Sequence, residues 1–375
     1  MQYKFQDRSK IDHALTTCLS RQVHFAAYKL PGDNPVTLII QKEPAIKPIK
    51  DIKQKLPDKG FLIVPFSTSE NNAYLIRPDI IFREGSDIAE LEYLNQISER
   101  SPCPVGNQEP SETSRKKYLD LIQQSIEKIN AGAFEKVVLS RVKPVEGNYS
   151  AELSAVFLAL CEMYPHAFVY LFHVDGQCWT GATPEPFVYS TKDSLITVSL
   201  AGTRPFSNEN LDIDNWNHKE KLEQEYVTRH IERTLSNYGV STYARKGPFI
   251  ARAGNLVHLR TDFSFSAAAL GNRLPSLIHT LHPTPAICGM PAKSALEFIR
   301  NHENYNREYY TGFLGPVGID DLLQLFVNLR CMKVLENKLI LYTGSGITDE
   351  SVAEEEWEET EIKADTLLAV LNKIK

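Results

Sequence analysis

The chain has 375 residues, of which 42% are hydrophobic, and a formal net charge of −6. This size allows a large buried core, so we expect one large domain or two tightly joined halves. The acidic balance argues against nucleic-acid binding, which usually requires a concentrated basic patch. No apolar run approaches the roughly 20 residues of a membrane helix. The N-terminus also lacks the basic and apolar segments of a signal peptide.

The cysteines stand singly, without a C-x-x-C pair that would indicate zinc or redox chemistry. We expect them to be reduced packing residues in a cytoplasmic protein. They are Cys18, Cys103, Cys161, Cys178, Cys288 and Cys331.

The first 110 residues contain strand-like runs but no motif with an assignable role. The runs are 36–41, 60–66 and 73–82, and a polar, proline-containing loop follows at 101–111. We therefore divide the chain into an N-terminal part, 1–110, and a region with motifs, 111–375.

Beyond the loop, helix and strand signals alternate. Apolar residues at helical spacing predict a helix over 118–129, which Gly132 is placed to end. The pair Asp175-Gly176 predicts a tight hairpin between the flanking apolar runs, and a hairpin implies antiparallel pairing. Long helices are expected over 216–238 and from 351 to the C-terminus.

Strand-rich stretches at 326–334 and 338–343 precede the last helix. The predicted class is α+β: large antiparallel β-sheets with helices packed on the outside.

Acidic residues occupy the face of the first long helix that should be buried. Glu220, Glu223 and Val227 lie at i, i+3 and i+7, and Ile231 continues the same stripe. Buried carboxylates are costly unless they are paired, hydrogen-bonded or bound to a metal.

The C-terminal helix repeats the pattern with Glu356, Glu359 and Lys363, followed by Leu367. From composition alone, a solvated acidic helix remains an alternative for this run. If the carboxylates do converge, Mg²⁺ suits all-oxygen ligands and takes its remaining ligands from water and substrate.

At these residues the sequence resembles the chorismate-utilising enzymes, a family that includes isochorismate synthase, salicylate synthase, aminodeoxychorismate synthase and anthranilate synthase component I. The resemblance implies that family's fold and chorismate as the small-molecule substrate. The matching segments follow in the family's order: FEKVVLSR (134–141), GATPE (181–185), LAGTR (200–204), KEKLEQE (219–225), VHL (257–259), LHPTPA (281–286), REYYTG (307–312), GSGI (344–347) and EWEET (356–360).

The resemblance also implies the roles of individual residues. Lys136 matches the general base that activates the attacking water, and Glu185 matches the acid that protonates the departing hydroxyl. Glu223 and Glu356 match direct Mg²⁺ ligands, with Glu220 and Glu359 beside them. Residues that match positions lining the site or holding the substrate carboxylates are Gly202, Thr203, His258, Tyr310, Arg330, Gly344, Gly346 and Lys363.

Each of these residues also has an ordinary structural interpretation. Lys136 could be a surface lysine, although strand alternation allows it to enter a pocket while Val137 packs behind it. Arg330 could form a structural ion pair, and His258 could be a core histidine. Gly344 and Gly346, placed between a strand and a helix, could form a turn or let backbone N–H groups approach an anion.

Two features indicate the branch of the family. Relatives that use ammonia usually carry glutamine where Lys136 stands, so the lysine indicates water as the nucleophile and no glutaminase subunit. The LHPTPA segment followed by Gly289, Pro291 and Ala292 is typical of isochorismate synthases, with salicylate synthases as the alternative.

A monomer is expected. A metal-dependent phosphohydrolase is disfavoured because no phosphate-binding loop is visible.

Overall fold

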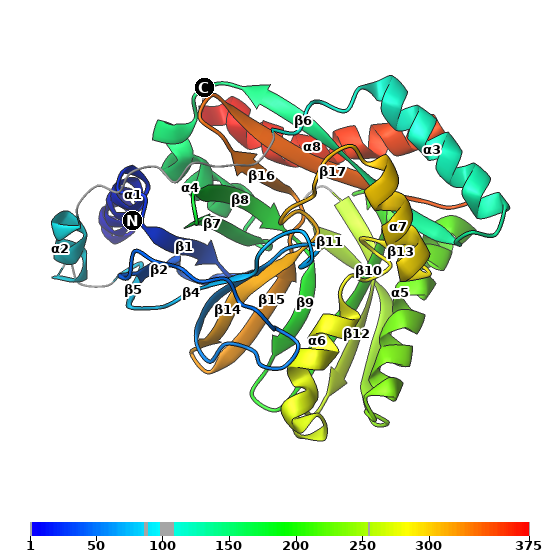
Figure 1. The fold of residues 1–375 in the computed structure, drawn as a ribbon, viewed down its shortest axis with the longest axis horizontal. Coiled ribbons are helices and arrows are strands. Elements are labelled where there is room, and N and C mark those ends of the chain that lie inside the picture. Colours follow the sequence, from blue (N-terminus) through cyan, green and yellow to red (C-terminus); the bar gives the residue numbers. More distant parts are fainter. Residues whose placement is uncertain (1, 86–88, 98–108, 254–255, 375) are drawn as a thin grey trace.

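The computed structural model describes residues 2–85, 89–97, 109–253 and 256–374. Two antiparallel β-sheets pack face to face, and helices cover their outer faces (Figure 1). The predicted α+β architecture with external helices is therefore confirmed.

The first sheet has nine strands, and every neighbouring pair is antiparallel. In spatial order these are β13 (Gly289–Met290), β6 (Lys136–Glu146), β17 (Lys338–Ile347), β16 (Cys331–Val334), β8 (Gln177–Thr183), β7 (Phe168–Val174), β1 (His24–Lys29), β2 (Thr37–Gln41) and β5 (Ile80–Arg83).

The second sheet has eight strands and is also antiparallel. Its spatial order is β11 (Ala244–Ala253), β12 (Leu256–Phe265), β10 (Leu195–Pro205), β9 (Pro186–Ser190), β15 (Leu322–Val327), β14 (Phe313–Ile319), β3 (Gly60–Val64) and β4 (Tyr74–Ile76).

An aromatic core joins the two sheets. Phe168 of β7 stacks on Phe326 of β15 with ring centroids 4.2 Å apart, and Trp179 packs against Tyr309 and Tyr342 in the same layer. Such ring pairs bury large apolar areas and add directional contacts, so they hold the two sheets in one relative orientation.

Helices complete the core on the outer faces. On the first sheet, α1 and α4 lie over one end, α8 runs along β17, and α3 and α7 cover β6. Helices α5 and α6 pack on the second sheet. The helices are α1 (Gln2–Ser20), α2 (Ala89–Gln96), α3 (Arg115–Asn130), α4 (Leu153–Met163), α5 (His218–Asn237), α6 (Leu274–Leu281), α7 (Ala292–His302) and α8 (Ala353–Ile374), and short 3-10 turns cover Ser150–Glu152, Glu209–Leu211, Ile213–Asn215, Ala267–Ala269 and Gly271–Arg273.

The hairpin and the helices follow the sequence pattern. Asp175 and Gly176 both adopt positive φ, at 49° and 73°, and connect β7 to β8 as predicted. Gly132, with φ of 76°, follows the end of α3. Helix α5 begins at His218, because the Asn217 side chain accepts a hydrogen bond from the Glu220 amide and caps the helix there.

The predicted strand-rich stretch 326–334 belongs to two strands, with an interruption at 328–330 that the sequence pattern did not indicate. The part before the break belongs to β15 in the second sheet, and the part after it forms β16 in the first sheet. The chain therefore passes from one sheet to the other at Arg330, which adopts a positive φ of 46°.

The N-terminal part contributes to both sheets. Strands β1, β2 and β5 extend the first sheet, and β3 and β4 form one edge of the second.

None of the helices in the described ranges combines the length and apolar character that crossing a bilayer requires. The cysteines of these ranges are free thiols, and Cys103 lies outside them.

Candidate active site

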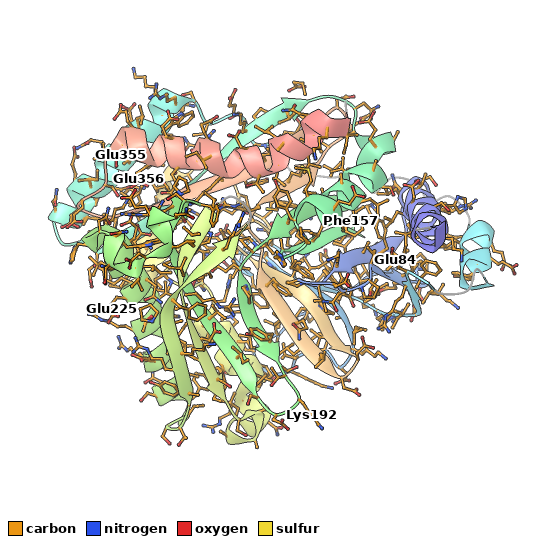
Figure 2. All side chains as sticks on the ribbon, turned by 180° about the vertical axis from the view of Figure 1, so that it is seen from behind. Glu84, Phe157, Lys192, Glu225, Glu355 and Glu356 are labelled. Carbon is orange, nitrogen blue, oxygen red and sulfur yellow. The ribbon has the colours of Figure 1, made fainter. Side chains whose placement is uncertain are left out.

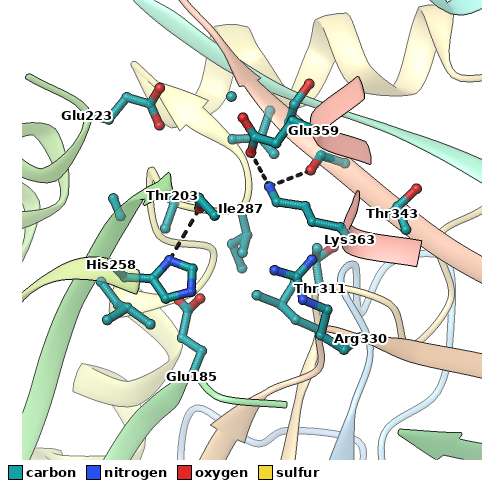
Figure 3. Close-up of a pocket in the computed structure, with 18 of the residues that line it drawn as sticks. Glu185, Thr203, Glu223, His258, Ile287, Thr311, Arg330, Thr343, Glu359 and Lys363 are labelled. Atoms are coloured by element: carbon teal, nitrogen blue, oxygen red, sulfur yellow. Dashed lines mark hydrogen bonds and ion pairs between the residues drawn. The ribbon is translucent and has the colours of Figure 1, made fainter. Parts of the chain in front are cut away.

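A cavity that is partly open to solvent lies where the two sheets meet α5 and α8 (Figure 3). All the predicted site residues line this cavity except Glu220 and Glu356, which lie next to it. Residues from matched segments spread over more than 200 positions of the chain thus meet in one place.

Lys136 is held at the start of β6 between two neighbouring strands. It pairs with Met290 of β13 on one side, while β17 continues beside β6 on the other. Its side chain is 1% exposed, and Nζ lies 3.3 Å from Oε2 of Glu223. The surface alternative for Lys136 is excluded, because this ammonium lies inside the protein against a carboxylate.

Gly344 and Gly346 lie within β17, rather than in a turn between strand and helix. A Cβ atom on Gly346 would lie 2.9 Å from Cε of Lys136 and 3.1 Å from Oε2 of Glu223. The carbonyl of Gly344 accepts a hydrogen bond of 2.8 Å from Lys363. The glycines therefore serve close packing of the charged side chains, a need that strand glycines often meet.

Glu223 of α5 and Glu356 of α8 converge on one ammonium group. Nζ of Lys219 forms an ion pair with Oε1 of Glu356 and lies 4.0 Å from Oε1 of Glu223. The side chain of Glu356 is 1% exposed, and its second oxygen, Oε2, is buried without a hydrogen-bond partner. Burial, reinforced by the nearby Glu359, raises the pKa of Glu356 to about 7.

The two outer glutamates have cations of their own. Arg204 pairs with Glu220 at 3.0 Å, and Lys363 forms an ion pair with Glu359. Burial acts to raise the pKa of Glu359, but Lys363 and other cations outweigh it and lower the pKa overall.

A metal site can be tested against these contacts. Among the described residues, no three His, Cys, Asp or Glu side chains are grouped for an ion. Glu223 and Glu356 nevertheless share one cation, and an oxygen of Glu356 has no partner. Mg²⁺ commonly binds one or two carboxylates and completes its shell with water and substrate. Two carboxylates with a free oxygen fit that pattern.

Glu185 follows β8 and is buried at the opposite end of the cavity. Its main chain is held by two hydrogen bonds, from its own N–H to Thr183 and from the N–H of Val327 to its carbonyl. Burial raises the pKa of its carboxyl to about 8, although Arg330 and two lysines act against this rise. Most of the Glu185 population is therefore protonated near pH 7.

His258 of β12 lies beside Glu185 (Figure 3). Its Nδ1 lies 3.0 Å from the carbonyl of Gly202, and its Nε2 is buried without a partner. Burial, with the nearby Arg330, lowers its pKa to about 4. The neutral ring donates from Nδ1–H to Gly202, which leaves Nε2 as a free acceptor facing the cavity.

Arg330 reaches the cavity because the first sheet opens beside it. Strand β16 begins at Cys331, which pairs with Tyr342 of β17. From Thr343 onward, β17 therefore has no β16 residue beside it, and this part of β17 lines the cavity. Burial lowers the pKa of Arg330. Within the described ranges its guanidinium forms no ion pair, which argues against a purely structural role and leaves its donors for a ligand.

The acidic run of α8 divides by face. Glu354, Glu355 and Glu358 are exposed, whereas Glu356 is buried. A solvated helix thus describes one side of α8, and the other side carries Glu356, Glu359 and Lys363 toward α5 and the cavity.

Two buried arginines support this arrangement and were not singled out from the sequence. Arg141 lies 4.0 Å over the Trp357 ring and donates to Thr360, which orients α8 against β6. Arg307 forms a buried pair with Glu303 and donates to the carbonyl of Val138, two residues after Lys136. Both arginines stand in matched segments, but only burial identifies their role.

The LHPTPA segment contributes to the cavity through its end. Ala286 and the following Ile287 line the wall, and Arg307 donates to the carbonyl of Ile287. His282 instead packs among Phe66, Phe187 and Phe313, where burial lowers its pKa to about 3.

The chain is similar in sequence and in structure to several known proteins. The sequence profile of the family described as chorismate binding enzyme matches residues 6–372. The vibriobactin-specific isochorismate synthase of Vibrio cholerae serotype O1 is 27% identical over 319 residues, which cover 82% of this chain and 78% of that protein. Isochorismate synthase EntC of Escherichia coli K12 is 31% identical over 245 residues, which cover 63% of this chain and 62% of EntC. The crystal structure of DhbC from Bacillus anthracis matches with a TM-score of 0.75 at 25% identity, covering 96% of this chain and 99% of that one.

Proposed function

Since the chain belongs to the chorismate binding enzyme family, we propose that it is an isochorismate synthase, an isomerase that interconverts chorismate and isochorismate. The observation that carries this proposal is the meeting in one cavity of Lys136, a candidate base, and Glu185, a candidate acid whose pKa burial raises to about 8. Names of the related proteins from Vibrio cholerae and Escherichia coli support the same activity.

The proposed reaction exchanges one hydroxyl for another around the ring. Lys136 in its unprotonated form takes a proton from water as the water oxygen attacks C2. Glu185 gives its proton to the C4 hydroxyl, which leaves as water while the ring double bonds shift. The raised pKa of Glu185 supports this role, because the group must enter the reaction protonated.

The remaining cavity groups are suited to hold the substrate. Arg330 and Lys363 supply positive charge for the carboxylates of chorismate, and Tyr310 and Thr203 offer hydroxyl groups. The free Nε2 of His258 can accept a hydrogen bond from a substrate hydroxyl.

We assign a magnesium site to Glu223 and Glu356, with Glu220 and Glu359 close by. When bound there, Mg²⁺ would hold the ring carboxylate and draw electron density toward it. The unpartnered oxygen of Glu356 supports this assignment, because a buried carboxylate oxygen is costly without a partner.

The proposed enzyme acts in the cytoplasm as a monomer, without a glutaminase subunit. The presence of Lys136 supports the last point, since water and not ammonia is then the nucleophile. The product would serve menaquinone or siderophore synthesis, since both routes use the same isomerisation.

A product analysis tests this function against the salicylate synthase alternative. Protein, chorismate and Mg²⁺ are incubated near neutral pH, and the products are separated by chromatography. We expect a chorismate–isochorismate mixture with the same ratio approached from either compound. Salicylate should form no faster than from isochorismate in protein-free buffer. Release of pyruvate in step with salicylate, in proportion to enzyme concentration, would assign the chain to the salicylate synthases instead.

A further inference from the structure

The side chain of Lys219 joins the two helices that carry the proposed metal ligands. Lys219 lies in the first turn of α5, one turn before Glu223, and its ammonium pairs with Glu356 of α8. One protein cation thus stands next to both of the carboxylates that are assigned to Mg²⁺.

The two carboxylates need a positive charge between them. Their side chains are only 13% and 1% exposed, and two like charges repel strongly where water is largely excluded. Lys136 approaches one oxygen of Glu223 at 3.3 Å, while Lys219 lies near its other oxygen. Among the described residues, only Lys219 forms an ion pair with Glu356.

The two lysines differ in their freedom to move. Lys136 is 1% exposed and is enclosed between β13 and β17. Lys219 is 20% exposed on a helix, and its four-carbon stem can carry the ammonium into solvent. The cation that can withdraw from the acids is therefore Lys219.

We propose that Lys219 is an internal counter-cation of the metal site. It holds Glu223 and Glu356 in position, and a divalent cation binds by displacing its ammonium from these carboxylates. The inference rests on the proposed magnesium site. Lys219 is accordingly a positioning residue that sets the affinity for Mg²⁺, because its ion pair must break before the metal binds.

Calorimetric titration of the substrate-free protein with Mg²⁺ alone tests this role. Lys219→Met removes the competing charge and should lower the Kd for Mg²⁺ about tenfold, which corresponds to about 1.4 kcal/mol. Lys221→Met is the matched control, since Lys221 is exposed on the same helix, and should keep the wild-type Kd. Lys219→Arg retains the charge and should bind Mg²⁺ no more tightly than the wild type.

Thermal unfolding gives a second readout and shows whether the variants fold. At the same Mg²⁺ concentration, the rise in Tm should be larger for Lys219→Met than for the wild type, because tighter binding stabilises the native state more. Lys219→Gln, also neutral but polar, should behave in the same way.

The outcomes separate this inference from the proposed function. An unchanged or higher Kd in both neutral variants, with a wild type that binds Mg²⁺, would overturn the counter-cation role alone. A wild type that does not bind Mg²⁺ would overturn the metal site itself, and the role of Lys219 with it.

Discussion

The two ends of the cavity differ in whether their ionisable side chains form ion pairs. At the end formed by α5 and α8, each acid has a cation from the protein: Glu223 lies against Lys136, and Glu356 pairs with Lys219. At the other end, Glu185 and His258 are buried and form no ion pair within the described ranges.

Burial shifts the pKa values of both groups at the unpaired end. Burial favours the neutral form and here outweighs the nearby charges, so the pKa of Glu185 rises to about 8 and that of His258 falls to about 4. At the paired end the carboxylates of Glu223 and Glu356 lie against lysines, although burial and Glu359 still raise the pKa of Glu356 to about 7. We infer that one end is built for a cation and carboxylates, and the other for proton transfer to a hydroxyl.

The largest expected effect comes from removing Mg²⁺ from the proposed site at the paired end. Chelation with EDTA should abolish isochorismate formation, and Mg²⁺ should restore it. Glu223→Ala and Glu356→Ala should fold but be inactive, because each loses a proposed ligand.

Glu355→Ala provides the control for this prediction, since the neighbouring Glu355 is exposed on α8. It should keep wild-type turnover in the chromatographic assay. Full activity after exhaustive chelation would rule out the magnesium requirement.

Loss of the proposed base, Lys136, should have the next largest effect. Lys136→Ala should reduce kcat by about 10²–10⁴-fold, the usual contribution of a general base, while substrate binding changes little. Steady-state kinetics measure both values. A variant that keeps more than a tenth of the wild-type kcat would make Lys136 a structural residue.

A smaller effect is expected when a methyl group is placed against Lys136 and the lysine itself is kept. In Gly346→Ala the new Cβ would contact Lys136 and Glu223, so both side chains must shift. A displacement of this kind should lower kcat by roughly 10–100-fold. If kcat were unchanged while Tm fell, the glycine would matter for strand packing and not for the position of Lys136.

The smallest effect concerns stability at the unpaired end. The folded pKa of Glu185 is about 8, above its value of 4.5 in the unfolded chain, so the native state binds the extra proton between these values. The wild type should therefore lose stability relative to Glu185→Gln as pH rises from about 4.5 to about 8, by a few kcal/mol at most.

Urea unfolding at pH 5 and pH 9 measures this difference. Glu225→Gln, on the outer side of α5 (Figure 2), is the control and should show little pH-dependent change. The same ionisation removes the proposed acid, so wild-type kcat should fall above about pH 8. Equal pH dependence of stability in the wild type and Glu185→Gln would contradict the raised pKa.

Periodicity predicted most of the regular structure because it depends on local spacing. Helix α5 lies within two residues of its expected bounds, and the β7–β8 hairpin turns at the predicted Asp175-Gly176 pair. The break at 328–330 was not predicted, because the apolar pattern continues across it. Only pairing with two different sheets divides β15 from β16 and turns Arg330 toward the cavity.

The supporting residues show a similar limit. Glu303 and Arg307 lie four residues apart, a spacing that any surface ion pair could share. Their importance follows from burial beneath β6 and from the bond of Arg307 to the carbonyl of Val138, and both depend on distant segments.

The sequence alone determined the fold class, because helix faces and hairpin turns depend on local spacing, and its resemblance to a known family implied which residues line or border the cavity. The tertiary structure alone decided which of these charges are paired. Glu356 and Glu355 are adjacent acids of the same type, yet one is buried next to Lys219 and the other is exposed. Ionic partners and burial depend on elements that are far apart in the chain, and these set the chemistry of each carboxylate.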